Sequence, residues 1–223
     1  LFSSSSIPSD LLVQGAMLLA SAAFWAYHAW LARNDAAAEP EIGGGATLRR
    51  WYLFGVAAVG LFLLTSGIRD FAVQWVTLIT DNSGAFSSIR PVIDAVAQVL
   101  TGLAAWLPVW LLVQGRVRTE SDEQRSLLRK VYLYGAVFVG AATALFSLAA
   151  WLQMFIIIAF GDPVPPAAML AQGTADTLVT ALLGALVWAY HARVLAADAR
   201  LPFEAPRQAS IRRLYDYLVA SIS

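Results

Sequence analysis

The two histidines of the chain are the residues whose type and spacing first point to chemistry. His28 and His191 each stand fourth in the run Trp-Ala-Tyr-His-Ala, which occurs twice. An imidazole nitrogen is a common axial ligand of haem and related pigments, so two histidines at one membrane depth form a candidate pigment site. Duplication alone also explains the match, and a third copy of the region carries Trp106-Leu107-Pro108-Val109-Trp110 instead. We favour this second interpretation and expect no cofactor.

Polar residues recur at matching places near one end of three apolar stretches. Asp94 lies twelve residues before Trp106, and Asp176 lies twelve residues before Trp188. An ionisable group inside a membrane segment is by default a candidate functional site, here for an ion or a proton. The alternative, which we favour, is that these groups join helices by hydrogen bonds worth roughly 0.6–2 kcal/mol each, or are solvated at the membrane edge. With the possible counter-charges, the candidate ion site consists of Gln14, Asp94, Asp176, Arg69 and Arg90.

Three segments open with the same pattern of two basic residues followed by tyrosine. They are Leu48-Arg49-Arg50-Trp51-Tyr52, Leu128-Arg129-Lys130-Val131-Tyr132 and Ile211-Arg212-Arg213-Leu214-Tyr215. Basic charge at a helix N-terminus opposes the helix dipole by about 0.3–1 kcal/mol per charge. Anionic inner-leaflet lipid attracts each basic residue by about 1 kcal/mol, which offsets this penalty. We therefore predict lipid-headgroup anchoring, with the phosphate of a partner or ligand as the alternative, for Arg49, Arg50, Arg129, Lys130, Arg212 and Arg213.

The composition excludes a water-soluble domain. Of the 223 residues, 59% are hydrophobic and 13% are charged, against about 45–50% and about 25% in soluble domains. The mean hydropathy is +0.64, and so few charges also argue against a disordered or nucleic-acid-binding chain. The absence of cysteine removes disulfides, thiol catalysis and cysteine-ligated metals. Metal-ligand spacings, a nucleophile elbow and a phosphate-binding loop are also missing from the sequence, so we expect neither an enzyme nor a metal site.

Five stretches are long and apolar enough to cross a bilayer, which takes about 20 such residues. They are Leu11–Leu31, Trp51–Ile68, Val92–Val113, Val131–Phe160 and Ala167–Leu195. A sixth begins at Ile211 and reaches Ser223 too soon to cross. Because the first residue is Leu1, we interpret the sequence as a piece of a longer chain. The predicted fold class is all-α: a polytopic transmembrane helical bundle with five full spans and the start of a sixth.

The basic residues predict how these spans are oriented. Segments 33–50, 116–130 and 193–213 hold 13 of the 15 lysines and arginines, and all seven tyrosines lie within a few residues of them. Short loops rich in lysine and arginine stay in the cytoplasm, and aromatic rings gather at the membrane interface. We therefore predict a multi-pass protein of a bacterial plasma membrane, with these loops in the cytoplasm and the N-terminus outside.

The recurring runs divide the chain into parallel two-helix repeats. Each repeat is a spanning helix, a cytoplasmic loop and a second spanning helix that opens with the basic pair. Two crossings return the chain to its starting side, so the copies would be related by an axis along the membrane normal. We predict repeats at residues 1–75, 76–160 and 161–223, the last with one full helix and a truncated second helix.

Aromatic first helices, short cytoplasmic loops and second helices that open Leu-Arg-Arg/Lys-x-Tyr-x-Tyr together resemble a bacterial family of repetitive integral membrane proteins. That family is known only as a domain of unknown function. The resemblance covers the whole chain and implies no reaction, cofactor or catalytic residue. We therefore expect a non-catalytic scaffold or accessory subunit, whose partners are the lipid bilayer and other membrane subunits or further copies of itself, but no nucleic acid. A transporter, channel or sensor that uses the intramembrane carboxylates is the alternative, and a pigment carrier ranks third.

Overall fold

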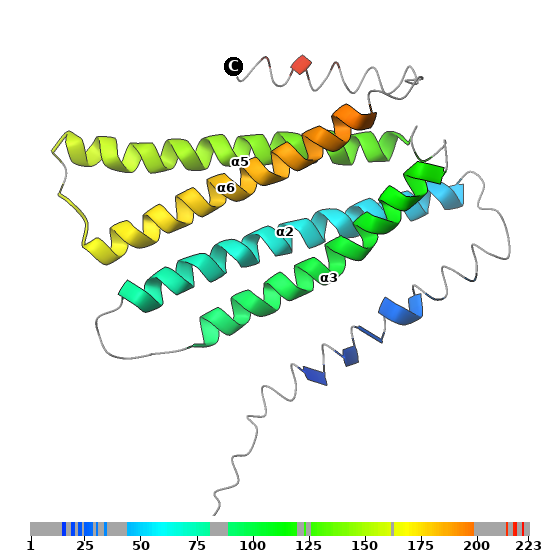
Figure 1. The fold of residues 1–223 in the computed structure, drawn as a ribbon, viewed down its shortest axis with the longest axis horizontal. Coiled ribbons are helices and arrows are strands. Elements are labelled where there is room, and N and C mark those ends of the chain that lie inside the picture. The colour runs from blue at the N-terminus through cyan, green and yellow to red at the C-terminus, as the bar shows by residue number, and fades with distance from the viewer. Residues whose placement is uncertain are drawn as a thin grey trace, which may run out of the picture. The chain divides into compact units, whose positions relative to one another are not determined.

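The computed structural model describes residues 44–80, 89–119, 123, 126–161 and 163–198, together with scattered residues between 15 and 34 and between 213 and 220 (Figure 1). This part of the chain contains four long helices: α2 (Gly44–Thr80), α3 (Arg90–Thr119), α5 (Leu127–Ala159) and α6 (Ala167–Asp198). No strand occurs among the described residues. Each of the four helices is long and apolar enough to cross a membrane. The fold is all-α, as predicted, and its helices indicate a multi-pass membrane protein.

The helices coincide with four of the five predicted spans, and each extends past at least one end of its span. α2, for example, runs beyond Ile68 through Arg69 and Asp70. A helix of 30 residues is about 45 Å long, which exceeds the hydrocarbon thickness of about 30 Å, so its ends reach the headgroup regions. The described residues cover the predicted span Leu11–Leu31 and the segment from Ile211 only in scattered positions. The count of five spans and the start of a sixth therefore stays a prediction.

Glycines let α2 and α3 pack backbone to backbone within the larger of the two compact units of the chain, residues 49–223. A Cβ added to Gly60 would lie 2.7 Å from the backbone nitrogen of Trp106, and one at Gly67 would lie 2.8 Å from that of Val99. Membrane helices associate through such small residues, because surrounding lipid supplies little hydrophobic force to press them together.

The pair α5 and α6 makes the same contact at corresponding positions. A Cβ added to Gly140 would lie 2.7 Å from the backbone nitrogen of Trp188, as at Gly60 and Trp106. The two glycines are 80 residues apart and the two tryptophans 82. Each close pair thus joins the second helix of one predicted repeat to the first helix of the next. The bounds of the three predicted repeats stay predictions.

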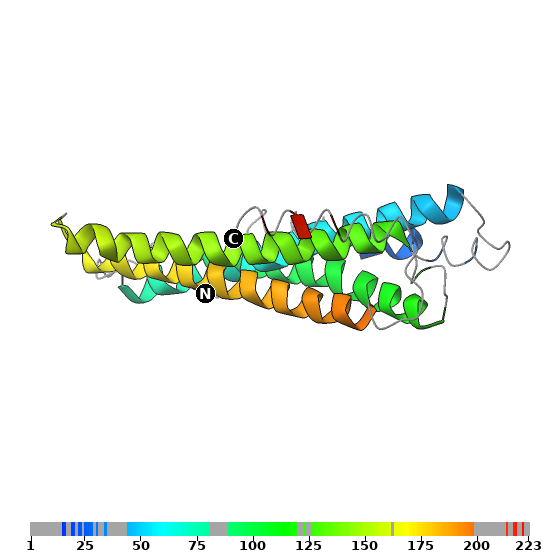
Figure 2. The same ribbon diagram turned by 90° about the horizontal axis from the view of Figure 1, so that it is seen from above.

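The two helix pairs meet where α2 and α5 begin and where α3 and α6 end, a place that we call the basic end (Figure 1, Figure 2). Phe54 of α2 forms a small buried core there with Val113 and Val117 of α3, and Leu128 and Tyr132 of α5 pack against it. The rings of Phe54 and Tyr132 have centroids 5.4 Å apart. We call the other end of these four helices the opposite end.

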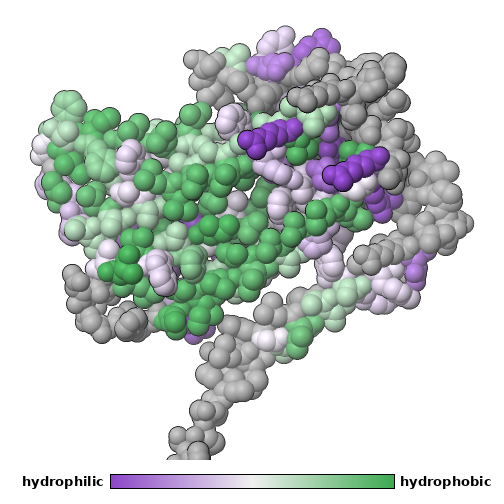
Figure 3. Space-filling view, in the orientation of Figure 1, coloured by the Kyte–Doolittle hydropathy of each residue, from purple (hydrophilic) through white to green (hydrophobic). Residues whose placement is uncertain are grey.

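Large apolar side chains cover the visible outward faces of the helices (Figure 3). Leu100 on α3, Phe146 on α5 and Leu182 on α6 are 60%, 72% and 60% exposed. Soluble monomers rarely expose contiguous apolar surface of this kind. Hydrocarbon or another apolar helix accommodates it without a penalty, so these faces fit a membrane environment.

Candidate functional site

A cavity of about 610 Å³ lies between α2, α5 and α6. Small residues of α5 leave room for it, since a Cβ added to Gly135 in its wall would meet no atom within 4 Å. The volume falls within the range of about 300–1,000 Å³ that is typical of small-molecule sites, so we take the cavity and the groups at its two ends as the candidate site. Most of the wall is apolar, and its polar members are Thr65, Ser66, Arg69, Tyr132, Thr143 and Thr180.

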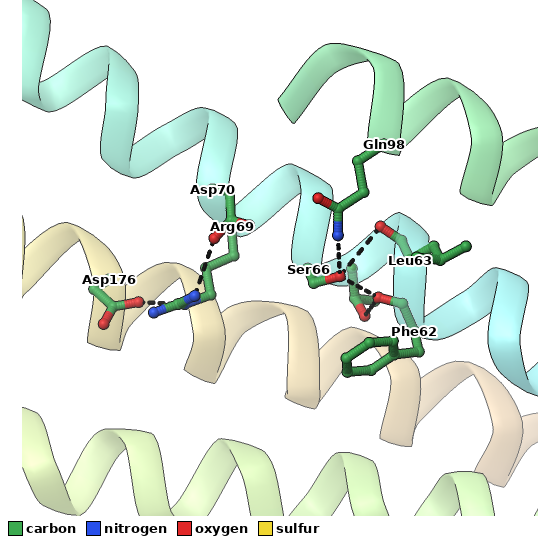
Figure 4. Close-up of polar contacts among 8 residues, drawn as sticks. Phe62, Leu63, Ser66, Arg69, Asp70, Gln98 and Asp176 are labelled. Carbon is green, nitrogen blue, oxygen red and sulfur yellow. Dashed lines mark hydrogen bonds and ion pairs between the residues drawn. The ribbon is translucent and has the colours of Figure 1, made fainter. Parts of the chain in front are cut away.

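Arg69 lines the cavity toward the opposite end and ties α2 to α6 (Figure 4). Its Nε donates a hydrogen bond to Oδ1 of Asp176, and its Nη1 donates to Oδ1 of Asp70 at 3.0 Å. The three side chains are 42%, 37% and 41% exposed, so the group is accessible from outside the bundle. Arg69 was predicted from the sequence as a counter-charge of the candidate ion site, and in the structure it contacts Asp176. Asp70 was missed, although it directly follows Arg69.

A second polar contact joins α2 to α3 one turn from Arg69 (Figure 4). Nε2 of Gln98 donates to Oγ of Ser66 at 2.8 Å, and Oγ of Ser66 donates to the carbonyl oxygen of Phe62 at 2.6 Å. Sequence reasoning did not single out Gln98. Its signal was present, because it is a glutamine inside an apolar span, four residues after Asp94.

The other members of the predicted ion site lie elsewhere or outside the described residues. Arg90 and Asp94 belong to the start of α3, and both are exposed. No ion pair between Asp94 and Arg69 occurs among the described contacts. Gln14 lies outside the described residues. A common site for all of these groups therefore stays a prediction.

Aromatic side chains surround a buried histidine at the basic end. His191 and Trp110 are each 1% exposed. Nδ1 of His191 lies 2.8 Å from the carbonyl oxygen of Val187, which accepts a hydrogen bond and so assigns the proton to Nδ1. Nε2 then faces the hydroxyl of Tyr132 at 3.5 Å, while Nε1 of Trp110 donates to the hydroxyl of Tyr190 at 2.5 Å. The cluster joins α3, α5 and α6, and Tyr132 also lines the cavity.

A pigment ligand needs a nitrogen lone pair that is directed at open space. In the structure both ring nitrogens of His191 face protein atoms. His28 belongs to the smaller compact unit, residues 1–48, where its ring lies edge-on to that of Tyr27 at a centroid distance of 5.5 Å. Pigment ligation by the two histidines stays the less favoured interpretation, and the geometry of His191 adds nothing in its favour.

The basic pair at the start of α2 binds a carboxylate from the α3–α5 connection. Nη2 of Arg49 donates to Oε1 of Glu123 at 2.9 Å, and Nε of Arg50 lies 3.1 Å from both carboxylate oxygens. Burial alone would raise the pKa of Glu123. The hydrogen bonds and charges of Arg50 and Arg49 outweigh burial and hold this pKa below its ordinary value. Sequence reasoning had assigned the two arginines to lipid headgroups and did not name Glu123.

The basic pair at the start of α5 binds a carboxylate at the end of α6. Arg129 Nε and Lys130 Nζ lie 2.9 and 3.6 Å from Oδ2 of Asp198, and all three side chains are buried. Both basic pairs thus hold helices together, a role that the sequence did not predict, because lipid headgroups and an external phosphate were the partners considered for them. Arg213 is exposed, and Arg212 lies outside the described residues. Lipid anchoring by the six basic residues stays a prediction.

Among known proteins, the chain matches a family but no characterised relative. A family model for a domain of unknown function, DUF5671, matches residues 50–182, which is more than half of the chain. No curated protein and no solved structure matches it.

Proposed function

We propose that this chain, which belongs to the DUF5671 family of unknown function, is a non-catalytic scaffold or accessory subunit of a membrane assembly. Arg69 carries this proposal. It lines the cavity, yet its guanidinium is engaged by Asp176 and Asp70. The other described wall residues are apolar or carry a hydroxyl.

An ion or proton path needs polar groups along its length, because a charge next to an apolar wall is strongly destabilised. This cavity has a charge at one end, and that charge is paired. An ion pair between α2 and α6 instead fixes the position of one helix pair against the other. The arrangement is therefore better suited to holding a bundle in shape than to conducting ions.

The proposed assembly uses the apolar faces of the bundle. Phe146 of α5 and Leu182 of α6 are mostly exposed, and they fit either acyl chains or the helices of another membrane subunit. Further copies of the same chain are an equally suitable partner by this chemistry. The basic end, which gathers Arg49, Arg50 and Arg129, is proposed to lie in the cytoplasm of a bacterial cell.

Native mass spectrometry of the protein extracted in a mild detergent tests the scaffold. We expect a complex of fixed stoichiometry, made with other subunits or with further copies. Asp176→Asn weakens the link between α2 and α6 and is expected to lower the yield of that complex. Asp94→Asn removes a matched but exposed carboxylate on α3 and is expected to leave the yield unchanged. A uniform monomer in the wild type would contradict the proposal.

The size of the cavity favours a transporter, channel or sensor as the second candidate. Its volume of about 610 Å³ accommodates a small molecule, with Arg69 and Ser66 near one end. In this case Asp176 would act by releasing or holding Arg69. Saturable flux into liposomes that is lost in Asp176→Asn and kept in Asp94→Asn would support this candidate. Full flux in both variants would show that the carboxylate of Asp176 has no role in transport.

A further inference from the structure

Arg129 is only 1% exposed, and one nitrogen of its guanidinium group has no hydrogen-bond partner. Its Nε and Nη2 donate to the two oxygens of Asp198 at 2.9 and 3.1 Å. Nη1 is buried and bonds to no acceptor. Native proteins rarely leave a buried charged donor unpaired, because the donor has lost its water and gained nothing in return. Nη1 of Arg129 therefore offers a buried donor to a further acceptor.

Gln114 on α3 supplies a second unpartnered donor at the same place. Its Oε1 lies 3.4 Å from Nη2 of Arg129, while its Nε2 is buried and makes no hydrogen bond. The amide and the guanidinium thus offer N–H groups to an acceptor from two different helices. As a whole residue Gln114 is only half-buried, so its side chain links the enclosed donor atoms to the surface of the bundle.

The surrounding charges favour an anionic acceptor. Among the described residues, Arg129 and Lys130 share the carboxylate of Asp198, and the three side chains are 1%, 7% and 8% exposed. Two positive charges against one negative charge leave one positive charge buried. Removal of an ion from water without a partner is strongly unfavourable, so this excess needs a counter-ion.

The corresponding cluster 80 residues earlier provides an internal comparison. Arg49 and Arg50 also share one carboxylate, that of Glu123, but their side chains are 22% and 19% exposed. Water can therefore reach that cluster from outside the bundle. The cluster at the start of α5 lacks this access and is the one that requires an anion.

The start of α5 adds a further contribution. Ser126 precedes this 33-residue helix and makes no side-chain hydrogen bond to its first backbone N–H groups. Such N–H groups carry partial positive charge and favour anions. By itself a helix start indicates no site, but here it coincides with the unpartnered donors of Arg129 and Gln114.

We propose that Arg129, Gln114 and Lys130 form a binding site for a phosphate group at the basic end, carried by an anionic lipid headgroup or present as free phosphate. A phosphate has several oxygen acceptors, so it can accept from Nη1 of Arg129 and Nε2 of Gln114 together. Arginine is well suited to this contact because its planar guanidinium presents several donors in a fixed geometry. The negative charge also neutralises the excess shared by Arg129 and Lys130. The site extends beyond the scaffold role, since it assigns a ligand to the bundle.

Thermal unfolding of the delipidated protein in neutral detergent tests the site. Phosphatidylglycerol is expected to raise the melting temperature by several degrees, with phosphatidylcholine as the lipid control and inorganic phosphate as the free-anion arm. Stabilisation by phosphatidylglycerol alone identifies a lipid headgroup, and stabilisation by both anions identifies the phosphate group itself. No stabilisation by either anion would overturn the proposal and leave water as the acceptor.

Gln114→Glu provides the decisive variant. The new carboxylate supplies Arg129 with an acceptor from within the chain. We therefore expect a higher melting temperature without anion, and a rise in melting temperature on addition of phosphatidylglycerol that is at least ten times smaller than in the wild type. Arg129 itself is left intact, because its removal would strand Asp198. Ala97→Glu adds a negative charge to an exposed position of the same helix near the opposite end and should leave the phosphatidylglycerol response unchanged. Equal responses in wild type and Gln114→Glu would overturn the proposal.

Discussion

Glu123 and Asp198 each neutralise part of a basic pair that opens a different helix. Asp198 is 69 residues from Arg129 in the sequence, and Glu123 is 74 residues from Arg49. Both carboxylates are largely buried, where ion pairs are sensitive to the loss of either partner. Single charged residues at the basic end therefore contribute to holding helices in register, whatever their relation to lipid.

The pH dependence of stability should report the Glu123 cluster. The pKa of Glu123 is lower in the folded protein than its ordinary value of 4.5, so its contribution is complete at neutral pH and is lost as the pH falls through the folded-state pKa. We expect Glu123→Gln to lower the free energy of unfolding by about 1–3 kcal/mol at pH 7, and by progressively less at acidic pH. Detergent-based unfolding followed by circular dichroism at several pH values measures this difference.

Asp94→Asn is the control for this experiment, because Asp94 is an exposed carboxylate on α3. It should unfold like the wild type at every pH. A Glu123→Gln deficit of the same size at neutral pH and well below pH 4.5 would show that the carboxylate's charge is not what stabilises the cluster.

Close helix pairs are the elements from which the larger compact unit is built. In each pair a glycine of one helix lies against a backbone nitrogen of the other, Gly60 against Trp106 and Gly140 against Trp188. Dispersion contacts at such short range replace the hydrophobic force that lipid does not provide. The two contacts lie at corresponding positions, and in each the closely packed helices belong to neighbouring predicted repeats. The internal repeat itself stays a prediction.

Gly140→Leu should separate α5 from α6. Its Cβ would lie 2.7 Å from the backbone nitrogen of Trp188, so the helices must move apart. We expect a loss of about 1–3 kcal/mol or more in the free energy of unfolding, the magnitude of an overpacked core. Gly135→Leu is the matched control on the same helix, because a side chain there enters the open cavity. Similar losses in the two variants would contradict the assigned helix contact.

At the level of the whole chain, the segregation of charge predicts how the protein is oriented in a membrane. Arg49, Arg50, Arg129 and Lys130 lie at one end of the larger unit, while Arg69 is at the other and is paired. Positive charge on one side predicts that this side remains in the cytoplasm during insertion. Since the chain has no cysteine, a single introduced thiol reports one position without interference.

Cysteine accessibility in spheroplasts measures this orientation. Val164→Cys lies in the exposed connection between α5 and α6, and we expect a membrane-impermeant maleimide to label it directly. Arg118→Cys lies at the exposed end of α3 and should be labelled only after permeabilisation. The reverse pattern would invert the predicted topology. Direct labelling of both positions would contradict an odd number of crossings between them.

Four helices that are long and apolar enough to span a membrane, and their shared basic end, were predictable from the residues alone. The hydrocarbon thickness sets the length of an apolar run, and backbone hydrogen bonds within that run must be satisfied locally, so a helix follows from nearby residues. Arg69 and Asp176 could likewise be named as candidates, because charges inside apolar spans stand out. Gln98 also lies inside an apolar span and could have been named. Asp70, Glu123 and Asp198 gave no comparable signal, since polar residues at the ends of apolar stretches are common.

Which of these groups meet depends on how each helix is rotated and which neighbour it packs against. Arg69 and Asp176 are 107 residues apart, and nothing in either local sequence requires their contact. Asp94 holds the matching place in its own apolar stretch and yet lies exposed. The difference arises because glycine contacts bring whole helices together, and these contacts then determine which side chains face a partner, a cavity or the surrounding lipid.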